Sequence, residues 1–281
     1  MDLTILPFLA APFVASLVLT GIHAYLGVHV VERGVIFVDL SLAQIAALGS
    51  ILALLLPFSG GDPHAPGVYW LSLGFTFIGA AVFSLVEGHK ARVPQEAIIG
   101  ISYAVASALA VVMLSKSTSE AEHLKDMLVG NILAVTWPQA LKTALLYSVI
   151  GTFHYVFRRR FLGISMDRAG AVSEGVSVRF WDFLFYASFG FVVTSSVAIA
   201  GVLLVFCYLI VPSVAAMMYA DRIGSRLAIG WTMGTTVSVL GMYFSVVLDL
   251  PTGATIVCTF GLVLVVMAMA RPLLVRRARL A

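Results

Sequence analysis

The feature that most constrains this chain is a series of apolar blocks, several of them about 20 residues long with few or no charges. At a rise of about 1.5 Å per residue, a helix of that length crosses a hydrocarbon layer of about 30 Å. Only 11% of the 281 residues are charged, and 60% are hydrophobic. A soluble domain has about 25% charged residues, because its surface must face water. The sequence therefore predicts an all-α polytopic membrane protein without a soluble domain.

The apolar windows predict about nine transmembrane helices. The stretch 181–219 is too long for one crossing, so the helix must break within it. The number of spans is eight instead of nine if the parts of this stretch together make a single broken crossing. Gly201 and Pro212 are the predicted places of the break, because glycine relaxes the backbone and proline removes a helical hydrogen bond. The nine windows are 5–28, 36–57, 67–87, 95–114, 130–157, 181–200, 201–219, 227–248 and 253–271.

The basic residues between the windows predict the orientation. When the spans are counted, the basic connections all fall on one side and the connections without lysine or arginine fall on the other. The positive-inside rule then places the C-terminus in the cytoplasm and, for nine spans, the N-terminus outside. The basic segments are HKAR (89–92), RRRF (158–161), DRIGSR (221–226) and the C-terminal RPLLVRRARLA, and the segments without lysine or arginine are FSGGDPHAPG (58–67) and DLPTG (249–253).

No linker or fixed-period repeat divides the chain, so residues 1–281 are predicted to form a single transmembrane domain in a bacterial inner membrane. We expect membrane lipid to surround this domain. The net charge of +3 gives no indication of nucleic-acid binding, because the basic residues lie between spans rather than on one face. The first apolar block has Asp2 in place of a basic n-region, and we interpret it as a retained span.

The sequence lacks the motifs of the common hydrolases. It contains no GxSxG elbow, no HExxH pair and no GxxxxGK[ST] phosphate loop. The chain is therefore predicted not to be an enzyme. If it takes part in transport that ATP drives, the ATPase must be a separate polypeptide.

Polar residues inside apolar windows are the main candidates for function, because each is costly at membrane depth unless it has a partner. The second window contains Asp39, Ser41 and Gln44, whose oxygens could ligate a divalent cation or a polar solute. Asp39 and Gln44 are five residues apart, about 140° around an ideal helix, so they do not share a face. The alternative for Asp39 is a position at the cytoplasmic end of the span, either solvated or paired with Arg33.

Histidines form a second set of candidates. His23 in the first span and His154 in the fifth could serve as neutral imidazole ligands, although a lone intramembrane histidine is more often a packing residue held by a hydrogen bond. His64 and His123 are predicted to face the outside, where they could meet an incoming metal ion. The ten methionines are scattered, so no soft-metal pathway is indicated.

Four stretches resemble the permease subunits of zinc and manganese ABC importers, which lie within the larger group that includes the vitamin B12 and iron-siderophore permeases. The most specific resemblance is a glycine-to-proline stretch before a basic turn, followed by a span that ends in aspartate, LP and glycine. The matches extend from the second span to the last. They are RGVIFVDLSLAQIAALG (33–49), LKDMLVGNILAV (124–135), GVLLVFCYLIVPSVAAMM (201–218) and DLPTGATIV (249–257).

The resemblance implies a type II ABC importer permease with the architecture of the vitamin B12 permease. It further implies a homodimer, two copies of a cytoplasmic ATPase, and an extracytoplasmic metal-binding protein that delivers the ion. The cargo would be a divalent metal, zinc favoured over manganese or iron, and no cofactor would be bound permanently. The candidates for the translocation path are Asp39, Gln44, Ser41, His23 and His64.

The turn that would contact the ATPase in such a transporter contains Asp221, Arg222, Gly224 and Arg226. Its alternative role is that of a simple positive-inside anchor. The segment from Arg158 to Arg179 resembles the short cytoplasmic helix that precedes the next span in this family.

The second span departs from the family's pattern. Many members carry an aspartate followed four residues later by a histidine, a pair that suits a divalent metal. This sequence has Gln44 where the histidine would fall, with Leu40 four residues before it and Asp39 displaced by one. Glutamine is a weaker ligand for zinc than imidazole, so the identity of the metal stays open.

Two alternatives remain from the sequence. The first is a permease of the same fold for a metal chelate such as a siderophore or cobalamin, although such relatives usually have about ten spans. The second is an ATP-independent channel or an intramembrane enzyme. The lack of paired catalytic residues within the spans argues against an enzyme.

Overall fold

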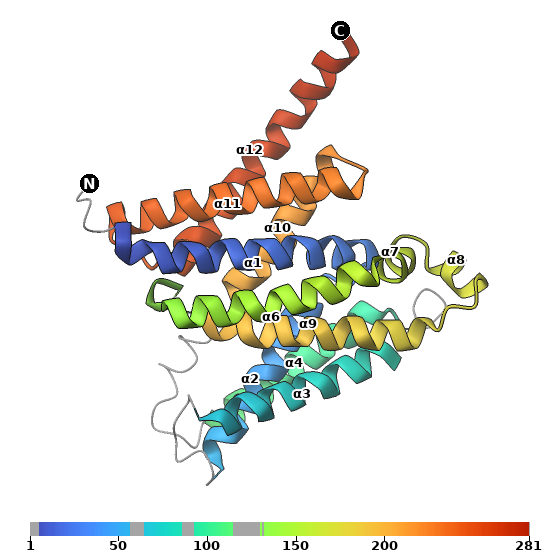
Figure 1. The fold of residues 1–281 in the computed structure, drawn as a ribbon, viewed down its shortest axis with the longest axis vertical. Coiled ribbons are helices and arrows are strands. Elements are labelled where there is room, and N and C mark those ends of the chain that lie inside the picture. The colour runs from blue at the N-terminus through green and yellow to red at the C-terminus, as the bar shows by residue number, and fades with distance from the viewer. Residues whose placement is uncertain (1–5, 57–64, 86–92, 115–129, 131, 281) are drawn as a thin grey trace. The chain divides into compact units, whose positions relative to one another are not determined.

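The protein is all-helical in a computed structural model that describes residues 6–56, 65–85, 93–114, 130 and 132–280. No strand occurs among these residues, which confirms the predicted all-α class. Figure 1 shows the course of the helices. Nine helices in the described part have 18 residues or more: α1 (Leu6–Arg33), α2 (Val38–Leu55), α3 (Pro66–Leu85), α4 (Gln95–Leu114), α6 (Trp137–Val156), α9 (Val178–Ala200), α10 (Val202–Tyr219), α11 (Ile223–Leu248) and α12 (Thr252–Leu280).

Each predicted window corresponds to one of these helices. Eight of the nine are long and apolar enough to cross a membrane. The exception, α6, has 20 residues and thus the length for a crossing, but its sequence includes Gln139, Lys142 and His154. The predicted number of eight or nine spans is confirmed, but α6 is the helix that leaves the number open. The stretch 181–219, from which the alternative of eight was derived, contains two candidate spans, α9 and α10.

Gly201 alone separates α9 from α10. Its φ of 75° lies in the left-handed region that favours glycine. Gly130, with a φ of 61°, lies against the same point, and a Cβ on Gly130 would come within 2.2 Å of the Ala200 carbonyl carbon. Two of the stretches singled out from the sequence, around residues 130 and 201, thus meet backbone to backbone.

The break expected at Pro212 does not occur, because α10 continues through this residue to Tyr219. Proline removes one helical N–H, but an intramembrane helix tolerates this loss where neighbouring groups satisfy the backbone. The carbonyl that loses its helical partner is that of Tyr208, four residues earlier. The expectation was wrong because a proline inside a transmembrane helix does not have to end the helix.

Two short helices lie between α6 and α9. They are α7 (Arg158–Met166) and α8 (Arg168–Ser173), separated by Asp167, whose carboxylate accepts a hydrogen bond from the Gly170 N–H at 2.8 Å. Neither has the length to cross a bilayer. A 3-10 turn, η3 (Ile132–Ala134), precedes α6.

The chain forms two compact units. The first contains residues 1–31, 129–149 and 199–281, and the second contains residues 32–128 and 150–198. Helices α1, α6 and α9 contribute residues to both units. The prediction that residues 1–281 act as one permease domain stays a prediction.

Glycines allow the helices of the first unit to approach closely. A Cβ on Gly27 of α1 would lie 2.0 Å from the Leu209 carbonyl oxygen of α10, and a Cβ on Gly234 of α11 would lie 2.5 Å from a methyl group of Thr20. Trp231 of α11 donates a hydrogen bond to the carbonyl of Gly21 at 3.1 Å. Small residues are the usual means of helix packing in lipid, where burial of apolar surface supplies no driving force.

Helix α2 is the centre of the second unit, where it packs against α3 and α4. Gly49 brings α2 within van der Waals reach of Ser72 on α3, and the Ser72 hydroxyl donates to the Ala46 carbonyl at 2.8 Å. On the α4 side, α2 contributes Leu48 and Ile51 to a buried apolar cluster. Helix α2 is thus covered on most of its circumference, and this burial extends to its polar residues.

We expect Gly27→Ala to destabilise the protein and Gly21→Ala on the same helix to leave it unchanged or more stable. The methyl group at position 27 would press on backbone, at a cost of about 1–3 kcal/mol, whereas nothing lies within 4 Å of a Cβ at position 21. Thermal unfolding of both variants in detergent measures the difference. A Gly27→Ala variant as stable as Gly21→Ala would show that α1 and α10 are not in close contact.

Candidate functional site

Asp39 lies in the first turn of α2 and is 1% exposed. Its Oδ1 atom has no hydrogen-bond partner among the described residues, and the same holds for the hydroxyl of Ser41, which is also buried. A buried polar group without a partner is destabilising, and a buried carboxylate more so. Unsatisfied polar groups of this kind are expected where a ligand or a passing ion completes the set.

Gln44 is buried in the same helix, with 8% of its surface exposed. It is three residues from Ser41, so these two side chains lie on one face of α2, while Asp39 lies on another. Because α2 is covered on most of its circumference, all three are inside the second unit. The structure therefore places the three α2 candidates at buried positions, and it does not gather them on one face.

Neither alternative proposed for Asp39 applies in this structure. The carboxylate is not solvated, and Arg33 pairs with Asp182 instead, with 2.7 Å between Nη1 and Oδ1. The turn between α1 and α2 is held to α4 by a hydrogen bond of 3.0 Å from the Phe37 N–H to the Glu96 carboxylate. Asp39 thus remains a buried carboxylate two residues beyond an anchored turn.

His23 lies in the first unit and is fully buried in α1. Its Nδ1 atom is 2.9 Å from the Leu19 carbonyl oxygen, which can only accept, so Nδ1 carries the proton. The Nε2 atom then has a free lone pair, and no described residue bonds to it. In this tautomer His23 can ligate a metal ion through Nε2.

The other histidine candidates differ in outcome. His64 and His123 lie outside the described residues. His154 is a packing residue: its Nε2 is 2.8 Å from the Ser188 hydroxyl, and its ring stacks on Phe161 at 4.3 Å between centroids.

The predicted ATPase-coupling turn connects α10 to α11. Asp221, Arg222 and Gly224 are exposed, whereas Arg226 is half-buried. The Arg226 Nε donates to the Ala220 carbonyl at 2.9 Å, at the C-terminal end of α10. A cation at this end of a helix is stabilising. Arg226 therefore shapes the turn, and the other three residues form its accessible surface.

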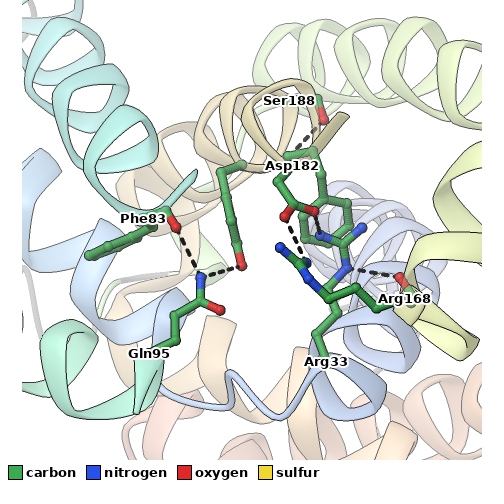
Figure 2. A network of polar contacts seen from close by, with 9 residues as sticks. Arg33, Phe83, Gln95, Arg168, Asp182 and Ser188 are labelled. Carbon is green, nitrogen blue, oxygen red and sulfur yellow. Dashed lines mark hydrogen bonds and ion pairs between the residues drawn. The ribbon is translucent and has the colours of Figure 1, made fainter. Parts of the chain in front are cut away.

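Reasoning from the sequence missed a buried ion network in the second unit. The Asp182 carboxylate lies between the guanidinium groups of Arg33 and Arg168, as Figure 2 shows. Below we call Arg33, Ser165, Arg168 and Asp182 the Asp182 network. One signal was present in the sequence, because Asp182 is the only acidic residue of α9.

The candidate ligands are mostly oxygen donors. No group of three or more histidine, cysteine, aspartate or glutamate side chains that could hold a metal ion occurs in the part of the chain that the structure describes. In the second unit, the Ser41 hydroxyl and the Gln44 amide lie on one face of α2 and the Asp39 carboxylate on another, and their oxygens are ligand atoms that suit a hard cation. In the first unit, His23 offers one nitrogen.

We expect Asp39→Asn and Asp182→Asn to affect stability in opposite ways. Removing the charge of Asp39 relieves the burial of an unpartnered carboxylate, so the unfolding temperature stays the same or rises. Asp182→Asn leaves the buried Arg33 cation without its counter-ion, at a cost of about 3–5 kcal/mol. Thermal unfolding of both variants tests this. An equal loss of stability in the two would mean that Asp39 has a stabilising partner.

The sequence is similar to those of several bacterial metal transport proteins. The manganese transport system membrane protein MntC of Listeria innocua is 28% identical over 204 residues, which are 68% of this chain and 71% of that protein. A probable iron transport system membrane protein of Haemophilus influenzae is 24% identical and covers 92% of this chain and 89% of its own length. The manganese import system permease protein ScaB of Streptococcus gordonii is 22% identical, and the match covers 92% of this chain and 90% of that protein.

The fold is similar to that of two solved structures. PsaBC from Streptococcus pneumoniae, in complex with Fab, superposes with a TM-score of 0.76 at 23% identity, covering 92% of this chain and 90% of that one. An inward-facing putative metal-chelate type ABC transporter gives a TM-score of 0.71 at 20% identity, with 93% and 85% covered. The predicted ABC importer permease architecture is confirmed. Residues 6–271 match the ABC 3 transport family, and the chain belongs to this family of membrane permeases.

Proposed function

We propose that this chain is the permease subunit of an ATP-driven importer of a divalent transition metal ion. The observation that carries the proposal is the buried Asp39 carboxylate in an ABC-3 permease, with one oxygen free of protein partners among the described residues. A carboxylate at membrane depth is expected to mark an ion path. The metal ion is the substrate and passes through.

Manganese is the leading candidate for the ion, ahead of the zinc that the sequence favoured. Asp39, Ser41 and Gln44 offer oxygen ligands, which suit manganese better than zinc. The only imidazole in the candidate set within the described residues is His23. Relatives named for manganese and for iron support the same ranking. A chelated-iron relative from Yersinia pestis keeps a metal chelate as the second candidate.

The orientation is proposed from the basic segments, with the C-terminus in the cytoplasm. Because the sequence has no phosphate loop, a separate ATPase would bind the cytoplasmic face. The permease would act as a homodimer, which is the arrangement that the resemblance to metal ABC importers implies. An extracytoplasmic metal-binding protein would deliver the ion. Its contact would include the turn at Asp249, which has φ of 52° and is followed by an exposed Leu250.

Two segments would contact the ATPase. The first is the accessible part of the α10–α11 turn, at Asp221 and Arg222. The second is α8 with its flanking residues 167–177, where Val172 is 60% exposed although it lies outside the spans. The segment is also the one that resembles the short cytoplasmic helix of this family.

Reconstituted transport provides the first test. Proteoliposomes with this chain, its ATPase and its binding protein are expected to import manganese only when ATP is present. Asp39→Asn and Gln44→Ala are each expected to lower the initial rate at least about tenfold, equivalent to about 1.4 kcal/mol. The assay uses radioactive manganese, with zinc, ferrous iron and cobalamin measured in parallel.

Ser50→Ala on the same helix is the matched control, because among the described residues the Ser50 hydroxyl bonds to the Ala46 carbonyl of its own helix. It is expected to transport at the wild-type rate. Uptake of cobalamin alone would contradict the proposal and support the chelate. Uptake of zinc alone would contradict the preference for manganese, and uptake without ATP would indicate a channel.

The contact with the ATPase can be tested by co-purification. We expect Arg222→Glu and Val172→Glu each to reduce the amount of ATPase that co-purifies with the permease at least about threefold, because each places a new charge on the proposed contact surface. Lys142→Glu is the control, since Lys142 is exposed near the start of α6, on the opposite side of the membrane by the proposed orientation. An undiminished yield of ATPase with either variant would remove that segment from the contact.

A further inference from the structure

The Asp182 carboxylate binds one arginine with each of its oxygens. Its Oδ1 is 2.7 Å from Arg33 Nη1, and its Oδ2 is 2.8 Å from Arg168 Nη1. The Arg33 Nε also donates to the Ser165 hydroxyl at 2.8 Å, and the guanidinium lies 4.0 Å above the centre of the Phe185 ring. One carboxylate thus links α1, α8 and α9, and α7 joins through Ser165 (Figure 2).

The two arginines are not equivalent. The side chains of Arg33 and Asp182 are 5% and 4% exposed, whereas that of Arg168 is 31% exposed. If Arg168 leaves, a neutral buried pair remains, and the departing guanidinium enters water. If Arg33 or Asp182 leaves, a buried charge is stranded at a cost of several kcal/mol. The network therefore has a permanent part, the Arg33–Asp182 pair, and a part that can separate at low cost, Arg168.

The permanent part is next to the candidate ion path. Arg33 is the last residue of α1, and the turn to α2 follows directly. The same turn is fixed at its other end by the hydrogen bond from Phe37 to Glu96. Asp39 comes two residues after Phe37. A displacement of Arg33 thus reaches Asp39 through one short segment held at both ends.

The separable part belongs to a helix that is loosely attached. Helix α7 is anchored by the fully buried Phe161, whose ring packs on His154 and Trp181. Helix α8 has one buried residue, Ala171, which packs with Ile164 and Val178. The Arg168–Asp182 ion pair adds a polar contact between α8 and α9.

A cavity gives α8 room to move. Its volume is about 920 Å³, and it lies between α8 and the ends of α1, α3, α4 and α9. Arg33, Gln95, Arg168 and Tyr186 are among the residues that line it. A shift of α8 toward or away from these helix ends would change the cavity without disturbing the packed part of the unit.

We propose that Asp182 is a positioning residue that couples α8 to the α1–α2 turn, with Arg168 as the contact that forms and separates during the transport cycle. This inference rests on the proposed function, in which an ATPase acts on α8 and an ion passes Asp39. With Arg168 in place, the position of α8 sets that of Arg33 and the turn. With Arg168 separated, the turn is released from α8 while the buried pair persists.

The first experiment measures coupling with Arg168→Gln in the reconstituted complex. The ratio of manganese imported to ATP hydrolysed is expected to fall at least fivefold, while the unfolding temperature and the amount of bound ATPase stay at wild-type values. Arg168→Lys is expected to restore at least half of the ratio, because Arg168 makes a single contact with Asp182 through one nitrogen. Arg158→Gln removes the same charge from α7, where Arg158 packs on Tyr155, and is expected to leave the ratio unchanged.

The second experiment does not depend on the cargo. Phe37→Cys, at a position that is 48% exposed, is labelled with a maleimide after Cys207 and Cys258 are replaced by alanine. The labelling rate is expected to change at least threefold between the nucleotide-free complex and the complex trapped with ATP and vanadate. Arg168→Gln should abolish this change, and Arg158→Gln should preserve it.

The two experiments separate failure of the inference from failure of the proposed function. If the wild-type complex imports no metal ion but the labelling change depends on Arg168, the cargo is wrong and the coupling stands. If manganese is imported and Arg168→Gln alters neither the ratio nor the labelling change, the coupling is refuted. A labelling rate that is insensitive to nucleotide in the wild-type background would also overturn it.

Discussion

Every polar group within a membrane span needs a partner, and this requirement organises the whole molecule. Most intramembrane hydroxyls meet it within their own helix, by donating to the carbonyl of the preceding turn. Asp39, Ser41 and the Nε2 atom of His23 are among the buried groups that do not meet it within the described residues. The same holds for Thr20 and Ser107, so Asp39, Ser41 and His23 are linked to an ion path by the proposed function and not by their burial alone. The hydroxyls that donate to a carbonyl of the preceding turn include Ser16 to Pro12, Thr76 to Ser72, Ser196 to Val192 and Ser238 to Gly234.

The same requirement explains why polar and aromatic groups surround the buried side chain of Arg33. Arg33 ends α1 as a buried cation, and its neighbours supply a carboxylate, a hydroxyl and an aromatic face. Such a set is stabilising only as a whole, because each member compensates another that would be costly alone. Arg33 differs from Asp39, because its Nη1 and Nε atoms have partners, although its Nη2 atom has none among the described residues. Two buried ionisable side chains six residues apart in sequence therefore differ in how far their polar atoms are satisfied.

The sequence predicted the spans well, because the length of an apolar run and the thickness of a bilayer are linked directly. It also placed a break at Gly201, since residues 181–219 exceed one crossing. It was wrong about Pro212, because tolerance of a proline depends on neighbours that a local pattern does not contain. The burial of Asp39 could not be predicted either, as it follows from helices covering α2 on several sides. Arg33 and Asp182 are 149 residues apart. The acidic residue in an apolar helix therefore indicated that Asp182 has a partner, but not which residue that partner is.

The single-residue connection at Gly201 has a consequence for how the protein is made. Consecutive Cα atoms are about 3.8 Å apart, so the end of α9 and the start of α10 cannot separate. The start of α10 must therefore reach the membrane together with the end of α9. Epitope tags or protease sites, which topology mapping places in loops, have no room between these two helices.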